Sequence, residues 1–69
     1  MISYIRGELV ALEEDKAIVD VGGVGYGIFM SGQAMGQLPP VGSKVKIHTY
    51  LNVKEDAIQL YGFLNRDAL

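Results

Sequence analysis

Apolar positions, many of them β-branched or aliphatic, dominate the start of the chain, which is typical of a strand. This first stretch runs from Ile2 to Leu12, and Ile5, Leu9 and Ala11 share one face with Gly7. A glycine inside such a pattern indicates a bulge or a tight bend, as the corner of a barrel requires. We therefore expect a first strand with an irregularity at Gly7.

Two further alternating stretches flank Gly22-Gly23, a dipeptide typical of a hairpin turn. The second predicted strand runs from Lys16 to Val21, and its inward residues are Ala17, Val19 and Val21. The third follows the turn, and its inward residues are Val24, Tyr26, Ile28 and Met30. Gly25 and Gly27 fall on the opposite face, where the absence of side chains lets a neighbour pack closely. These stretches predict a hairpin.

A short helix is expected next, because Ser31 can accept a hydrogen bond at a helix N-terminus. The helix would extend through Gln37 or Leu38, and Pro39-Pro40 would end it. Asn65 could likewise cap a helix that begins at residue 66.

The fourth predicted strand, Lys44 to Leu51, shows the clearest alternation in the chain. Its inward residues are Val45, Ile47, Thr49 and Leu51, and its outward residues are Lys44, Lys46, His48 and Tyr50. A turn over Asn52–Asp56 leads into a fifth strand, Ala57 to Phe63.

This order of elements predicts an all-β fold, a five-stranded Greek-key barrel of the OB-fold type with one short helix between strands 3 and 4. An SH3-like barrel is the structural alternative. Residues 1–63 would form the domain, and residues 64–69 would begin a linker or helix.

Composition limits the functions that such a barrel could have. The chain has 69 residues, no cysteine and a net charge of −2. One small domain without disulfides is marginally stable, so we expect self-association or a neighbouring domain to cover part of its surface. A module that grips nucleic acid by itself is usually basic, and this chain is not. No apolar run could span a bilayer and no secretory signal is visible, so we expect no membrane partner and a cytoplasmic location.

We find no catalytic motif and no cofactor-binding motif in the sequence. The glycines between Gly22 and Gly27 do not have the G-x-G-x-x-G spacing of a dinucleotide site, and no long helix follows them. His48 is the single histidine, and cysteine is absent, so neither a metal site nor a nucleophile with its base is expected. We expect no enzyme activity and no cofactor.

Two binding surfaces remain open from these residues. Lys44, Lys46 and Tyr50 on one strand face could hold a single-stranded nucleic acid by charge and stacking, although such a face is also ordinary surface. Glu55 and Asp56 share a predicted hairpin tip, where two adjacent acids by themselves indicate a solvated turn.

The chain resembles the N-terminal domain of the RuvA family from Met1 to Phe63, in one register. The strings that carry the resemblance are Gly22-Gly23-Val24-Gly25-Tyr26, Leu38-Pro39, Val53-Lys54-Glu55-Asp56-Ala57 and Leu60-Tyr61-Gly62-Phe63, with Met1-Ile2 and Arg6-Gly7 at the start. The resemblance implies an OB-fold domain of a homotetramer that holds Holliday junction DNA open. It also implies that residues 64–69 lead into a second domain that this sequence lacks.

The resemblance gives the acidic tip a role. It implies that Glu55 and Asp56 form the acidic pin of the family near the fourfold axis, with Lys54 as a possible phosphate contact at its rim. A RuvB-type ATPase motor and a RuvC-type resolvase would be partners of the full-length protein. Carboxylates repel phosphates over a Debye length of about 8–10 Å, so the pin would direct strands away from the junction centre. A self-association module and a generic OB-fold binder of single strands, using Lys44, Lys46 and Tyr50, are the alternatives.

Overall fold

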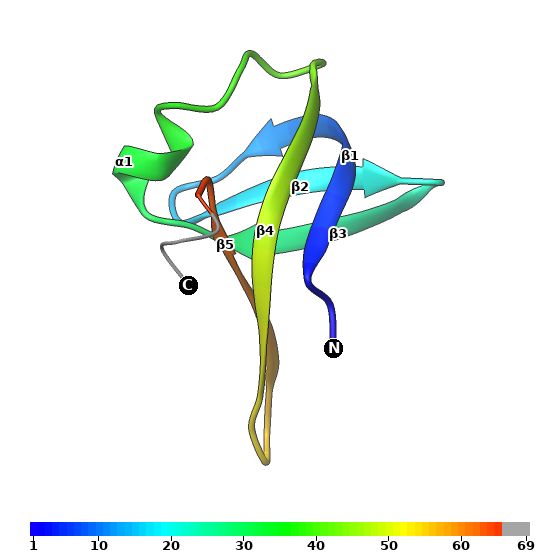
Figure 1. Cartoon of the computed structure of the whole chain (residues 1–69), viewed down its shortest axis with the longest axis vertical. Helices are drawn as coiled ribbons and strands as arrows, with labels where there is room; N and C mark the ends of the chain where they lie inside the picture. The colour runs from blue at the N-terminus through cyan, green and yellow to red at the C-terminus, as the bar shows by residue number, and fades with distance from the viewer. Residues whose placement is uncertain (66–69) are drawn as a thin grey trace.

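Five strands and one short helix make up the part of the chain that the structure describes, residues 1–65 of a computed structural model (Figure 1). In chain order they are β1 (Tyr4–Leu12), β2 (Lys16–Val21), β3 (Val24–Phe29), α1 (Gly32–Met35), β4 (Lys44–Val53) and β5 (Ile58–Phe63). The predicted order of elements is confirmed. The helix predicted to begin at residue 66 lies outside the described residues.

The strands close into a barrel in the order β1-β2-β3-β5-β4, with β1 and β4 paired to complete the ring. All neighbouring strands are antiparallel except β3 and β5, which pair in parallel through Ile28 with Leu60 and Phe29 with Tyr61. The closed five-stranded barrel with a helix between β3 and β4 confirms the predicted OB-fold.

β1 changes its pairing partner along its length, from β4 to β2, and Figure 1 shows the strand curving between these two neighbours. Its first half, up to Glu8, pairs with β4, and from Glu8 onward it pairs with β2. The register shifts between Leu9 and Ala11, so Val10 is the extra residue of a β-bulge. The bulge that was predicted as one possibility at Gly7 therefore lies at Val10 instead.

Gly7 instead permits a close approach between β1 and the end of β2. A β-carbon at this position would collide with the carbonyl oxygen of Asp20 and would lie 2.9 Å from Cγ2 of Val21. The close approach and the bulge are separate features, because the bulge needs an extra residue whereas the approach needs a missing side chain.

Aliphatic side chains from every strand fill the barrel, and the four largest fully buried ones are Leu9, Val19, Ile28 and Ile47. Each contributes about 1.5–3 kcal/mol to folding through the apolar area it buries. Among the described residues Thr49 is the buried polar one, and its Oγ1 donates a hydrogen bond of 2.7 Å to the carbonyl oxygen of Ile2. The predicted inward face of β4 is confirmed for Val45, Ile47 and Thr49.

Val21 and Val24 depart from the predicted pattern because both are exposed although they alternate with core residues. They pair with each other at the end of the β2–β3 hairpin, next to the Gly22-Gly23 turn. Both turn glycines have positive φ, of 60° and 92°, as a tight turn requires. The hairpin thus extends past the point where the barrel can cover its inner face.

The helix begins as predicted, since Oγ of Ser31 accepts a hydrogen bond of 3.1 Å from the backbone N–H of Ala34. It ends at Met35, earlier than Gln37 or Leu38. Gly36 follows at the C-terminus, where the entropic cost of glycine works against further helix. Met35 is the residue of α1 that is buried in the core.

Candidate nucleic-acid interface

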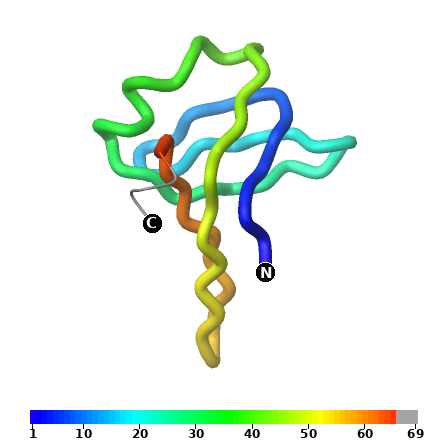
Figure 2. The backbone as a smooth tube through the Cα atoms, viewed as in Figure 1, coloured from blue at the N-terminus to red at the C-terminus, as the bar shows by residue number. Residues whose placement is uncertain are grey.

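β4 and β5 continue past the barrel as a two-stranded hairpin whose strands wind about each other (Figures 1 and 2). Pairing persists through Asn52 with Gln59 and Val53 with Ile58, so β4 ends later than the predicted turn at Asn52. The last buried residue along this hairpin is Leu60, which faces the half-buried Leu51. Glu55 lies four positions beyond Leu51, so at about 3.3 Å per residue the tip is about 13 Å beyond the core.

Glu55 and Asp56 form the loop at this tip. The backbone N–H of Lys54 donates a hydrogen bond of 2.7 Å to the carbonyl oxygen of Ala57, which leaves two residues in the loop. Within residues 1–65, no residue other than glycine has positive φ. The favoured two-residue hairpin turns need positive φ and select Asn-Gly or Asp-Gly. Turn preference therefore does not explain a Glu-Asp pair at this position.

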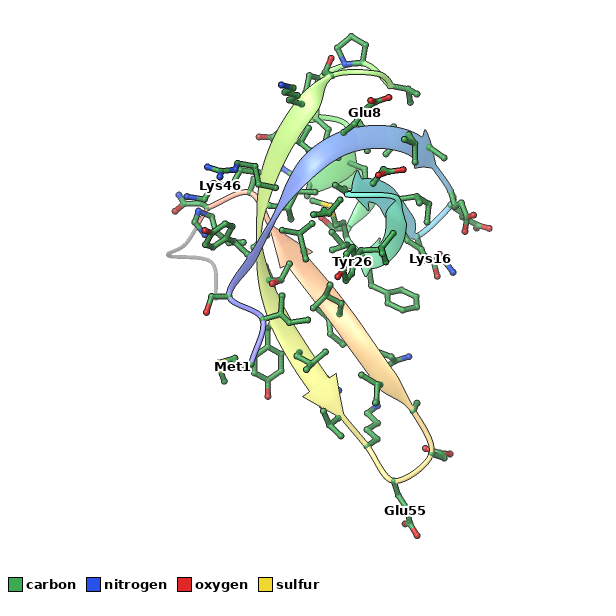
Figure 3. All side chains as sticks on the ribbon, turned by 90° about the vertical axis from the view of Figure 1, so that its right-hand side faces the viewer. Met1, Glu8, Lys16, Tyr26, Lys46 and Glu55 are labelled. Atoms are coloured by element: carbon green, nitrogen blue, oxygen red, sulfur yellow. The ribbon has the colours of Figure 1, made fainter. Side chains whose placement is uncertain are left out.

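The tip presents its two carboxylates to solvent without a counter-charge in contact. Figure 3 shows Glu55 at the far end of the hairpin, and Asp56 is exposed beside it. Within residues 1–65 the one ion pair joins Lys16 and Glu13, at 3.6 Å. Lys54 is also exposed, so the tip has one positive and two negative charges and remains negative.

An apolar pair accompanies the acidic tip. Val53 and Ile58 are opposite each other in the register and are 64% and 71% exposed. They occupy the side of the hairpin that faces the core further up, where Leu51 and Leu60 pack. The hairpin therefore offers an uncovered apolar surface next to its charged end.

The outer face of the β1–β4 pair is a second candidate surface. Lys44, Lys46 and Tyr50 are exposed as predicted, whereas His48 is half-buried. The pairing with β1 adds residues that the sequence pattern did not assign to this face: Tyr4 is opposite His48, Arg6 is opposite Lys46 and Glu8 is opposite Lys44. The alternation Tyr4-x-Arg6-x-Glu8 was the available sign, but the partner strand was not known.

We define the basic–aromatic face as the six residues Tyr4, Arg6, Lys44, Lys46, His48 and Tyr50. Nζ of Lys46 lies 4.7 Å from the centroid of the Tyr4 ring, within the range of a cation–π interaction. A hollow of about 700 Å³ lies over Tyr4, His48 and Tyr50, and a second of about 470 Å³ lies over Arg6 and Lys44. Lys46 lines both.

Residues 1–65 contain no group of three histidine, cysteine or acidic residues placed to hold a metal ion. No helix in the same part of the chain is long and apolar enough to cross a membrane. The hairpin tip gathers carboxylates and the basic–aromatic face gathers cations, so both surfaces are candidates for contacts with charged macromolecules.

Comparison with known proteins shows which family the chain belongs to. A model of the RuvA N-terminal domain matches residues 1–62. Proteins named Holliday junction branch migration complex subunit RuvA are similar to the chain. The one from Lachnospira eligens is 55% identical over 100% of this chain, and those from Prosthecochloris aestuarii and Acetivibrio thermocellus are 49% and 46% identical over 97% and 100% of it. The chain spans about a third of the length of these curated relatives, 33%, 34% and 34% respectively. The chain therefore belongs to the RuvA N-terminal domain family.

Proposed function

We propose that this chain is the N-terminal module of a longer protein that binds Holliday junctions, and that its hairpin tip repels DNA strands from the junction centre. The observation that carries this proposal is the pair of carboxylates without a counter-charge, Glu55 and Asp56, held about 13 Å beyond the barrel core by a regular hairpin. The relatives are named as subunits of a Holliday junction branch migration complex, and these names indicate the Holliday junction as the DNA that is bound.

The tip acts by charge. One carboxylate and one phosphate that are 4 Å apart repel each other by about 1 kcal/mol in water, and by more where solvent is displaced. In the proposed homotetramer the tips converge near the fourfold axis, so eight carboxylates, two from each subunit, face any strand that crosses it. The strands then separate and leave along the four arms. Lys54 holds a phosphate at the rim of this zone.

Assembly into the tetramer would also cover apolar surface. Val53 and Ile58 lie beside the tip and are 64% and 71% exposed in the single chain. Full burial of an aliphatic side chain contributes about 1.5–3 kcal/mol, so contacts here would help hold neighbouring hairpins together. In this proposal a RuvB-type motor and a RuvC-type resolvase bind the full-length protein in the bacterial cytoplasm, and the module itself is not catalytic.

The test is to neutralise the tip in the full-length protein with Glu55→Gln and Asp56→Asn. We expect junction affinity to stay the same or to rise, because a repulsive element is removed, while motor-driven branch migration changes. Gel-shift titration with a four-way junction and a strand-exchange assay measure the two quantities separately.

The chain offers a matched control in Glu14 and Asp15, a second adjacent Glu-Asp pair that is exposed at the turn between β1 and β2. Glu14→Gln with Asp15→Asn changes the net charge by the same amount and should leave both assays unchanged. A large loss of junction affinity in the tip variant, or equal effects of the two double variants, would contradict the pin role.

Self-association of the isolated chain is the second function to test, and the exposed pair Val53 and Ile58 favours it. Sedimentation at several concentrations should show association that is lost in Ile58→Thr. A strict monomer at every concentration would mean that the assembly needs the rest of the longer protein.

A further inference from the structure

Positive and negative side chains lie on different surfaces of this chain, which the net charge of −2 does not show. The basic–aromatic face carries Arg6, Lys44 and Lys46, and Glu8 is the one carboxylate that projects beside them from the same two strands. Acidic residues gather instead at turns, in the Glu13–Asp15 segment and at the hairpin tip. On a surface that serves only solubility, positive and negative side chains are interspersed. The separation seen here therefore favours a ligand-binding role for the basic–aromatic face.

The three cations are available for such a ligand. None of them makes an ion pair with any other residue between 1 and 65, although Glu8 is directly opposite Lys44 in the register. Figure 3 shows Lys46 on the same side of the molecule as Met1, away from both Lys16 and Glu55. A polyanion that bound here would gain charge contacts without breaking an ion pair.

Aromatic rings lie beside these cations on the same face. Tyr4 and Tyr50 are 48% and 51% exposed, and both line the larger hollow with His48, which is opposite Tyr4 in the register. Exposed rings next to cations are the combination with which proteins hold single strands, since unstacked bases pack on the rings while phosphates meet the charges. Bases within a duplex present only their edges, so the rings favour a single strand.

The length of the face also fits. Lys44 and Tyr50 are six positions apart on β4, which corresponds to about 20 Å of strand. Lys46 lines both hollows, so their linings together cover this distance. Binding sites on OB-folds span about 4–16 nucleotides, and a strand at the short end of that range would occupy the groove.

We propose that the basic–aromatic face, formed by the outer side of β1 and β4, is a binding site for single-stranded DNA. It is not the face formed by strands 2 and 3 on which OB-folds commonly bind oligonucleotides. In this chain Lys16 on β2 is paired with Glu13, and Asp20 adds a negative charge there.

This site acts independently of the acidic tip. Val53 is the last residue of β4 before the acidic tip, and about 23 Å of strand separates it from Lys46. This distance is close to three Debye lengths at physiological salt. The carboxylates of Glu55 and Asp56 therefore do not cancel the positive potential of the face. The choice of DNA over RNA rests on the proposed function, whereas the position of the site does not depend on the junction pin.

The experiment titrates the 69-residue chain with a labelled oligothymidylate of about ten nucleotides and follows fluorescence anisotropy as salt is varied. Three cations predict a slope of about −2 for the logarithm of affinity against that of salt, since each contributes about −0.7 on single strands. Lys44→Gln with Lys46→Gln should reduce the slope to about −0.7. Tyr50→Thr, which keeps a strand-forming residue, should weaken binding about 5- to 150-fold.

Two control variants test whether binding depends on the basic–aromatic face. Lys16 also lies over an aromatic ring, 5.5 Å from the centroid of Phe29, but it belongs to another face, so Lys16→Gln should leave affinity and slope unchanged. Glu55→Gln with Asp56→Asn should also leave single-strand binding unchanged, which keeps this result distinct from the junction test. Circular dichroism checks that each variant is folded.

Several results would overturn the proposal: no binding at low salt, equal loss in Lys16→Gln, or equal affinity for a duplex of the same length. Stronger binding of oligouridylate than of oligothymidylate would overturn the assignment to DNA. Amide shifts in NMR spectra should cluster at Tyr4, Arg6, Lys46 and Tyr50, and shifts confined to β2 and β3 would place the ligand elsewhere.

Discussion

Replacing Gly62 by alanine tests the closeness of packing where β5 closes the barrel. A β-carbon at this position would lie 2.5 Å from Cγ2 of Ile28, 2.8 Å from Cγ2 of Ile47 and 3.2 Å from Cγ of Met30. The first two separations are shorter than carbon atoms tolerate, and Ile28 and Ile47 are fully buried, so neither methyl group has free space to move into. The extra methyl group must displace β5 or force the isoleucines from their rotamers.

Gly25 supplies the matched comparison. It is also a strand glycine, but a β-carbon there would meet only Cγ2 of Ile18, at an ordinary 3.6 Å. Neither Gly25 nor Gly62 has positive φ, so alanine brings no backbone strain at either position. Both substitutions reduce the entropy of the unfolded chain equally, a gain of about 0.4–1 kcal/mol. The difference between the two variants therefore isolates the cost of overpacking.

Overpacking a well-filled core costs about 1–3 kcal/mol. For a domain of this size each kcal/mol shifts Tm by about 4–8 °C, so Gly62→Ala should melt about 4–24 °C below Gly25→Ala. Thermal unfolding followed by circular dichroism, with urea unfolding as a second measure, gives both values. Equal midpoints for the two variants would refute the reasoning, because they would show that β5 can move away from the isoleucines at no cost.

Three further substitutions probe other contacts. Thr49→Val removes the donor to the carbonyl oxygen of Ile2 and should cost about 0.5–1.5 kcal/mol in urea unfolding, because this part-buried hydrogen bond is lost. Ser31→Ala removes the cap of α1 and should lower the free energy of unfolding by about 0.5–2 kcal/mol, and Ser31→Asn should restore it. Leu9→Ala should cost about 2–5 kcal/mol. A domain this small rarely has more than about 3–5 kcal/mol to lose, so its NMR spectrum should lose dispersion at room temperature.

Much of the fold followed from local pattern, because a period of two identifies both a strand and its inward face. The alternation in residues 44–51 predicted the burial of Val45, Ile47 and Thr49, and the structure confirms it. The Ser31 cap and the Gly22-Gly23 turn were also predictable, since a side-chain acceptor and a positive φ are properties of single residues. The placement of Glu55 and Asp56 at a hairpin tip belongs to the same class, and their role at a junction stays a proposal.

The tertiary structure alone decided where the barrel ends and which strands meet. Val53 and Ile58 follow the inward alternation yet are exposed, because the hairpin continues past the last layer of side chains that could cover them. The basic–aromatic face depends on β1 pairing with β4, two strands that lie far apart along the chain. Alternation shows which side of a strand faces inward. Which strands pair, and how far along a strand its inward face stays covered, depend on closure of the whole barrel. Closure is a property of all five strands together.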